Sequence, residues 1–142
     1  MTNGRSPTPR LRVDWPVNGE KYYKDNGYRI NMLFVGYYVA KDQNSLLSYS
    51  YDGNIMTIDP VSTGNPGWPT FLQAYNQFCS DGGGIPLPNQ TYGITRPQLQ
   101  RALGERLQKF AAARKQYDPT GRLLNGYFAD LLAEGEGAVA HV

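Results

Sequence analysis

Cysteine and histidine are nearly absent from this chain of 142 residues, which contains one of each, Cys79 and His141. A single cysteine cannot form an internal disulfide, and the two residues together cannot supply a metal site built from several histidines or cysteines. A Ser/His/Asp triad would have to take its base from His141, close to the end of the sequence, where chains are usually poorly ordered. We therefore expect no bound metal and rank hydrolase chemistry behind other functions.

A large charge of one sign and a long apolar run are also missing. The 14 Lys and Arg residues against 12 Asp and Glu give a formal net charge of +2, which is too small to favour nucleic acid or an acidic membrane surface as a partner. No apolar run approaches the roughly 20 residues of a membrane span, and residues 1–9 lack the apolar core of a signal peptide. We expect a cytoplasmic protein that binds neither nucleic acid nor membranes.

The residues that are present fit one folded domain, because 40% of them are hydrophobic and 13% are aromatic. Residues 1–24 are rich in Pro, Arg, Asn and Gly, which predicts an extended N-terminal arm. Residues 25–132 then form a single domain, and residues 133–142 form a flexible tail.

Two regions have the composition of β-strands. Residues 28–39 are apolar or aromatic at positions of both parities, which predicts a strand covered on both faces. Residues 46–51 and 54–58 flank Asp52-Gly53, the pair that a type I′ turn prefers, and this predicts a β-hairpin. The hairpin would pair Leu47 with Ile58 and Tyr49 with Met56.

Helical spacing of apolar residues predicts two longer helices. The first follows Asn65-Pro66-Gly67 and ends at Gly82-Gly83-Gly84. The second begins with the capping box of Thr95 and Gln98 and extends to about Tyr117. A short last helix follows Asn125, a plausible N-cap. The predicted fold is therefore α+β, with a small antiparallel sheet packed against two longer helices and a short C-terminal helix.

Several groups with possible chemistry have a simpler structural interpretation. The triple glycine follows a helix and is not followed by Lys-Ser or Lys-Thr, so we interpret it as a helix stop and not as a phosphate loop. Cys79 lies on the apolar stripe of the first helix and is expected to pack in the core. The basic residues between Arg96 and Lys115 are expected to form a solvated helix face.

Tyrosines and a proline-rich segment supply the candidate site. Tyr37, Tyr49 and Tyr51 belong to a group of tyrosines in the strand region, which either pack as core or line a cavity for a flat apolar ligand. Two prolines flank Leu87 and are expected to hold Asn89 in an extended backbone, from which its amide would face a ligand; the alternative is a stiff connector.

The last third of the chain resembles a known family. A Lys-x-Tyr-Asp-Pro turn ends the second helix and is followed by a basic residue, two apolar residues and Asn, at Lys115, Tyr117, Asp118, Pro119, Arg122, Leu123, Leu124 and Asn125. This pattern resembles the closing segment of FAD-linked oxidases of the vanillyl-alcohol oxidase superfamily. The hairpin, the Trp-containing helix and residues 84–91 are most similar to the substrate domain of the flavoprotein cholesterol oxidase group. The resemblance covers about residues 28–132.

The resemblance implies roles for two asparagines. Asn89 would be a catalytic residue near the flavin ring and the substrate hydroxyl, and Asn125 would be a cofactor-binding residue in the closing turn. The FAD-binding half of such enzymes is not in this sequence, so FAD would be held mainly by a partner chain. Where such enzymes carry Glu-x-Arg near the flavin, this chain has the stretch from Ser48 to Tyr51.

Two functions follow as hypotheses. In the first, the chain is the small subunit or C-terminal portion of an FAD-dependent oxidoreductase and forms the substrate side of the active site for a bulky apolar alcohol or ring substrate. Tyr37, Tyr49 and Tyr51 would then shape the pocket. In the second, the chain is a stand-alone flavin-free binding module, or a small cyclase-type enzyme, that uses a tyrosine-lined cavity.

Overall fold

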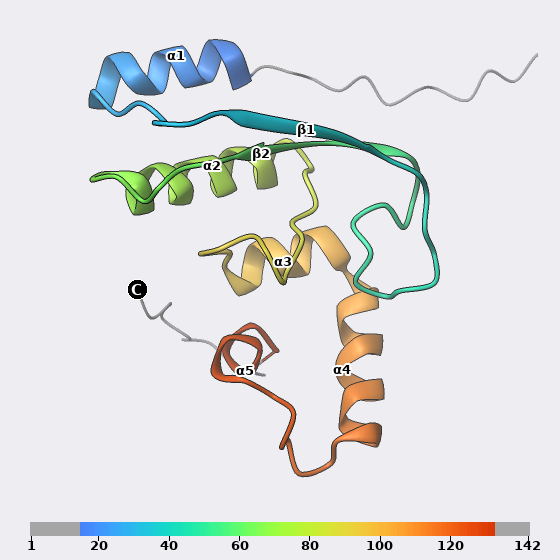
Figure 1. Cartoon of the computed structure of the whole chain (residues 1–142). Helices are drawn as coiled ribbons and strands as arrows, with labels where there is room; N and C mark the ends of the chain where they lie inside the picture. The colour runs from blue at the N-terminus through green and yellow to red at the C-terminus, as the bar shows by residue number, and fades with distance from the viewer. Residues whose placement is uncertain (1–14, 133–142) are drawn as a thin grey trace, which may run out of the picture.

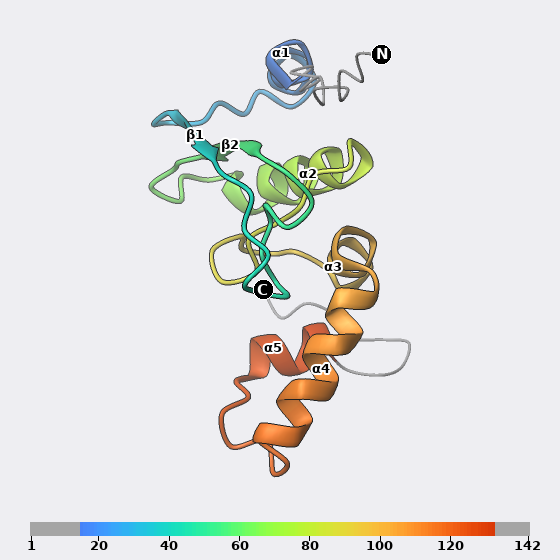
Figure 2. The same ribbon diagram turned by 90° about the vertical axis from the view of Figure 1, so that its right-hand side faces the viewer.

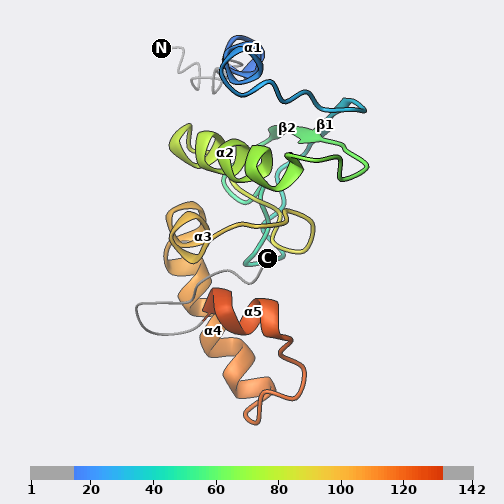
Figure 3. The same ribbon diagram turned by 90° about the vertical axis from the view of Figure 1, so that its left-hand side faces the viewer.

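The computed structural model describes residues 15–132 (Figure 1). In chain order its elements are α1 (Trp15–Asn26), β1 (Phe34–Val39), β2 (Ile55–Pro60), α2 (Trp68–Asp81), α3 (Arg96–Leu103), α4 (Glu105–Tyr117) and α5 (Gly126–Leu132). They are stacked along the long direction of the molecule, with α1 at one end, then the strands, α2 and α3, and α5 with the end of α4 at the other (Figures 1, 2 and 3). The predicted α+β class, with a small antiparallel sheet packed against helices, is confirmed.

The sheet pairs other residues than the sequence predicted. β1 and β2 are antiparallel, and their register aligns Phe34 with Pro60 and Val39 with Ile55. The predicted hairpin across Asp52-Gly53 is therefore wrong, and so are the pairs of Leu47 with Ile58 and of Tyr49 with Met56. Residues 40–54 form a long loop instead, because the apolar residues of β1 take the partners that the hairpin would have used.

The predicted cover on both faces of the first strand is also wrong. Six large apolar residues on or beside the strands are each about half exposed, and we name them the strand patch: Met32, Leu33, Phe34, Tyr37, Tyr38 and Met56. Phe34 and Tyr38 lie on one face of β1, whereas Tyr37 lies on the other, because side chains alternate along a strand. Within the described part of the chain, both faces of the sheet thus carry exposed apolar surface.

The first predicted helix is confirmed as α2, and its apolar stripe forms an aromatic cluster. Gly67 precedes it in the left-handed region, with φ of 89°, and a Cβ there would meet the Tyr28 ring at 2.8 Å. Phe71 and Tyr75 are buried, and Phe71 contacts the rings of Tyr22, Tyr28 and Trp68. This cluster ties α2 to the segment that precedes the strands.

The second predicted helix is divided into two. The capping box is present, since Thr95 N–H donates to Gln98 Oε1 (3.0 Å) and Gln98 N–H donates to Thr95 Oγ1 (3.4 Å). The helix then stops at Gly104, whose φ of 53° and ψ of −130° separate α3 from α4. The helices α3, α4 and α5 enclose an aliphatic cluster of Ile94, Leu99, Leu103, Leu107 and Leu131.

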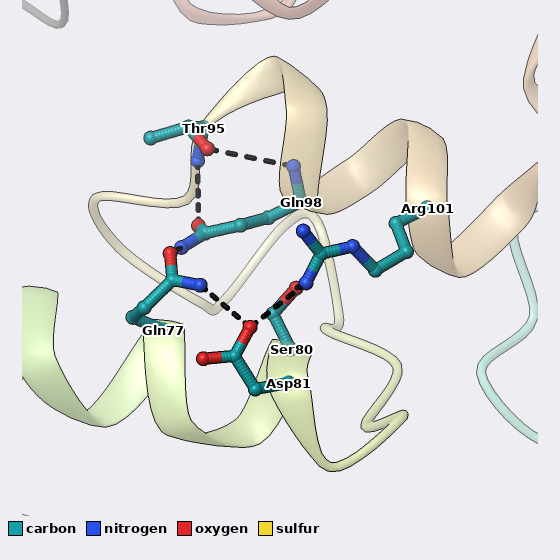
Figure 4. A network of polar contacts seen from close by, with 6 residues as sticks. All are labelled: Gln77, Ser80, Asp81, Thr95, Gln98 and Arg101. Atoms are coloured by element: carbon teal, nitrogen blue, oxygen red, sulfur yellow. Dashed lines mark hydrogen bonds and ion pairs between the residues drawn. The ribbon is translucent and has the colours of Figure 1, made fainter.

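Polar side chains join α2 to α3 (Figure 4). The Gln98 amide donates to Gln77 Oε1 at 3.1 Å, and Arg101 donates to Ser80 Oγ at 3.1 Å and to Asp81 Oδ1 at 3.0 Å. Gln98 and Ser80 are buried, so these bonds satisfy groups that would otherwise lose their contact with water. The network joins α2, which carries the buried residues of the aromatic cluster, to α3, which carries part of the aliphatic cluster.

The N-terminal region differs from the expected extended arm, because residues 15–24 belong to helix α1. Residues 1–14 and the predicted tail from 133 to 142 lie outside the described residues, and the division into arm, domain and tail stays a prediction. None of the helices in residues 15–132 is long and apolar enough to cross a membrane.

Candidate functional site

A hollow of about 300 Å³ lies between the loop 40–54, the segment 85–93 and α5. Both sides carry apolar and polar groups. The lining residues are Asp42, Ser45, Leu47, Ser48 and Tyr49 from the loop, Leu87, Pro88 and Asn89 from the segment, and Phe128 from α5. The hollow therefore combines apolar walls with hydroxyl, amide and carboxylate groups, a combination that binds small organic molecules.

Short-range hydrogen bonds shape the loop side of the hollow. Asp42 Oδ1 accepts from the main-chain and side-chain N–H groups of Asn44, at 2.9 and 2.8 Å. Ser48 N–H donates to the carbonyl of Ser45 at 3.1 Å, and the hydroxyls of Ser48 and Ser50 lie 3.3 Å apart. Ser and Asp side chains favour such turns because they bond to nearby main chain. The loop thus has a defined shape although it is neither helix nor strand.

A tight turn presents Asn89 on the opposite side. Leu87 N–H donates to Thr91 Oγ1 at 3.1 Å, and its carbonyl accepts from the N–H groups of Gln90 and Thr91 at 2.9 and 2.8 Å. The predicted extended backbone at Asn89 is therefore wrong, because these bonds close a turn around it. Asn89 is exposed at the apex of that turn.

Two neighbouring side chains hold the segment 85–93 in place. Asn76 of α2 donates from its amide to the carbonyl of Tyr92 at 2.9 Å, and the Tyr127 hydroxyl donates to the carbonyl of Thr91 at 3.3 Å. Burial raises the pKa of Tyr127, so its hydroxyl keeps its proton and remains a donor over the physiological range. The turn of Asn89 is thereby linked to both α2 and α5.

The structure brings together two of the five predicted site residues. Tyr49 and Asn89 line the hollow from opposite sides. Tyr51 lies instead against Arg106, whose guanidinium carbon is 4.4 Å from the ring centroid. Tyr37 lies on β1 and is 54% exposed, outside the hollow.

Asn125 serves as the N-cap of α5, where its Oδ1 accepts from Phe128 N–H at 2.9 Å. This confirms the predicted cap. Phe128 itself lines the hollow, so Asn125 acts on the hollow by fixing the start of the helix that carries this ring. The binding of a cofactor by Asn125 stays a prediction.

Sequence reasoning missed the other lining residues. Asp42 and Ser45 fall between the predicted strand and the predicted hairpin, Leu47 belongs to the predicted hairpin, and Phe128 belongs to the predicted last helix. Their meeting depends on how the loop 40–54 folds back on the helices, for which the sequence carries no local signal.

The triple glycine does not form a cradle for the phosphates of a dinucleotide. The N–H groups of Gly82, Gly83 and Gly84 donate to the carbonyls of Phe78, Ser80 and Cys79, at 3.0, 3.1 and 2.7 Å. They close the end of α2, as predicted, and so cannot bind a pyrophosphate. No Lys or Arg lines the hollow. In residues 15–132 there is also no group of three His, Cys, Asp or Glu side chains that would hold a metal ion.

Comparison with known proteins identifies the family. The family model described as D-arabinono-1,4-lactone oxidase matches residues 37–131. Curated proteins and solved structures gave no match. The matched residues include both sides of the hollow and all of α2, α3 and α4. The resemblance to FAD-linked oxidases is thereby confirmed, whereas the closer placement in the cholesterol oxidase group has no support from the comparison. The chain belongs to the D-arabinono-1,4-lactone oxidase family, whose members are C-terminal domains of FAD-linked oxidases.

Proposed function

We propose that this chain forms the substrate side of the active site of an FAD-dependent oxidoreductase that oxidises an alcohol. The observation that carries the proposal is the hollow, which Tyr49 and Asn89 both line, in a chain of an FAD-linked oxidase family. The hollow has the mixed lining of a small-molecule site, and the N–H groups of the triple glycine close the end of α2 instead of facing a phosphate. We therefore assign substrate binding to this chain and cofactor binding to another domain.

The lining favours a small ring substrate that carries hydroxyl groups. Asp42, Ser45, Ser48 and Asn89 offer acceptors and donors for hydroxyls, and Leu87 and Phe128 offer apolar surface for a ring. A volume of about 300 Å³ lies at the small end of ligand sites. A sugar lactone, the substrate class in the family's name, matches this lining better than the bulky apolar alcohol expected from the sequence.

We propose that FAD is held mainly by a partner chain that carries the FAD-binding domain, in a cytoplasmic complex. The strand patch supports a partner, because large exposed apolar patches mark interaction surfaces. In this arrangement Asn89 orients the substrate hydroxyl, while Tyr49 and Phe128 shape the wall on either side of it.

The first experiment is to purify the full chain from its native source with the proteins bound to it, and to record the visible absorption and the oxidation of sugar lactones. A yellow complex that oxidises a lactone supports the proposal. A colourless chain that binds or converts a ligand by itself contradicts it and favours the flavin-free binding module or cyclase-type enzyme.

The Asn89→Ala variant tests the site in the assembled complex. Losing one hydrogen bond to the substrate should lower kcat/KM by about tenfold. Unfolding stability should change by less than about 0.5 kcal/mol, because Asn89 is exposed. Gln90→Ala is the matched control, since Gln90 is the exposed neighbour that does not line the hollow. Equal kcat/KM in both variants and the wild type would remove Asn89 from the site.

A further inference from the structure

The side chain of Arg106, on α4, binds main-chain carbonyls of the loop 40–54. Its NH1 donates to the carbonyls of Leu46 and Ser48, at 3.2 and 2.8 Å. The side chain is only 12% exposed, which contradicts the solvated face expected for this arginine. A guanidinium offers several N–H donors in a fixed planar arrangement, which allows it to bond both carbonyls at once.

Two further contacts fix the orientation of this guanidinium. Its carbon lies 4.4 Å from the centroid of the Tyr51 ring, in a cation–π contact. Its NH2 lies 3.8 Å from Oδ2 of Asp52, which is largely exposed, so that ion pair contributes little. The plane of Arg106 is therefore set by one ring and two carbonyls, all from the same loop.

The two carbonyls lie within the part of the loop that lines the hollow. Leu47 lies between them in the sequence, and Ser48 and Tyr49 follow it. The bonds within the loop join its residues to one another and give it a shape. Arg106 attaches the loop to α4, and Leu47 packs on the aliphatic cluster.

We propose that Arg106 is a positioning residue of the active site, which holds the Leu47–Tyr49 wall at the distance from Asn89 that the substrate requires. This inference rests on the proposed function of the hollow. Arg106 does not line the hollow itself, so it acts on the substrate through the loop.

The first test measures the loop directly in the full chain. Amide hydrogen exchange is compared for the wild type, Arg106→Ala and Arg106→Lys. In the Ala variant, peptides that cover residues 45–51 should exchange at least about tenfold faster, because the loop loses its attachment to α4. The Lys variant should be intermediate, since an ammonium on a flexible stem cannot bond both carbonyls and stack on Tyr51 in one geometry. Arg101→Ala is the control, because Arg101 also joins two elements but binds Ser80 and Asp81.

The second test measures catalysis in the assembled complex. Arg106→Ala should raise KM by about tenfold and change kcat less than about threefold, because the wall binds the substrate without touching the reacting atoms. Arg106→Lys should recover part of the lost affinity, and Arg101→Ala should leave KM unchanged.

Unchanged loop exchange and KM in a folded Arg106→Ala variant would overturn the inference, and so would an equal rise of KM in Arg101→Ala. If the Ala variant does not fold, Arg106→Lys decides, and wild-type exchange and KM in that variant overturn it. If the wild-type complex oxidises no lactone or alcohol, the proposed function fails, and the exchange of residues 45–51 still decides whether Arg106 fixes the loop.

Discussion

Cys79 illustrates how burial decides the chemistry of one side chain. It lies on α2 beside the aromatic cluster and is partly buried. Burial raises the pKa of its thiol, and a hydrogen bond with Tyr75 lowers the pKa by a smaller amount. Because only the thiolate attacks electrophiles, a raised pKa leaves less of the reactive form at any given pH. Cys79 is thus suited to packing, as its position in the apolar stripe indicates.

We predict that iodoacetamide labels Cys79 more slowly in the folded chain than in the chain unfolded by urea. The labelling rate of the unfolded chain should level off above about pH 8.5, the ordinary pKa of a free thiol, whereas the folded chain should keep gaining rate at higher pH. Mass spectrometry at a series of pH values measures both. Coinciding pH profiles would show that burial does not control this thiol.

Gly104 determines where one helical pattern becomes two elements. Its φ of 53° and ψ of −130° lie outside the regions that residues with a Cβ adopt, and no side chain blocks the position. The N–H of Gly104 donates to the carbonyl of Gln100, and its carbonyl accepts from Leu107 N–H. The glycine therefore ends α3 and starts α4 at the same point, which directs α4 and its Arg106 toward the loop.

Replacing Gly104 by Ala should destabilise the chain by about 1–3 kcal/mol, because the strained backbone must move or remain strained. Urea unfolding measures the change. Gly126→Ala is the matched control, since Gly126 is a helical residue with ordinary φ and open space around it. That control should be neutral or stabilising by up to about 1 kcal/mol. Equal losses in the two variants would contradict the role of the backbone angle.

The helices show which parts of this fold local sequence can predict. The ends of α2 are predictable, because Asn65-Pro66-Gly67 and the triple glycine act within a few residues of the helix. The capping box of Thr95 acts in the same way. Gly104 was overlooked because one glycine within a periodic pattern is usually tolerated, and only its φ and ψ show the break.

The strands and the hollow show what local sequence cannot predict. Asp52-Gly53 favours a turn, but the partner of β2 is chosen by competition between residues 34–39 and residues 46–51. β1 takes this place, and Leu47 is left to pack on the aliphatic cluster while Arg106, far along the chain, binds the carbonyls beside it. Tyr49 and Asn89 were predicted from residue type, whereas Asp42 and Phe128 reach the hollow only through this long-range folding.

Several large apolar side chains remain exposed in the described part of the molecule, and six of them form the strand patch. Each of the six residues of the strand patch is about half exposed, and together they leave apolar surface on both faces of the sheet. A two-stranded sheet is also marginal by itself. The FAD-binding domain, which the family requires and the described residues do not contain, is the occupant we propose for this patch.

The variant Tyr38→Lys tests that assembly. Tyr38 is 67% exposed and lies opposite Met56 in the sheet, so a charge there should leave the free chain within about 0.5 kcal/mol of wild-type stability. In the complex the ammonium would be buried without a partner, which should reduce the flavin that copurifies with the chain by at least about tenfold. Tyr117→Lys is the matched control, because Tyr117 is 85% exposed at the end of α4, away from the strands. Full flavin content with Tyr38→Lys would place the FAD-binding domain on another surface, and equal loss with Tyr117→Lys would indicate an effect of charge alone.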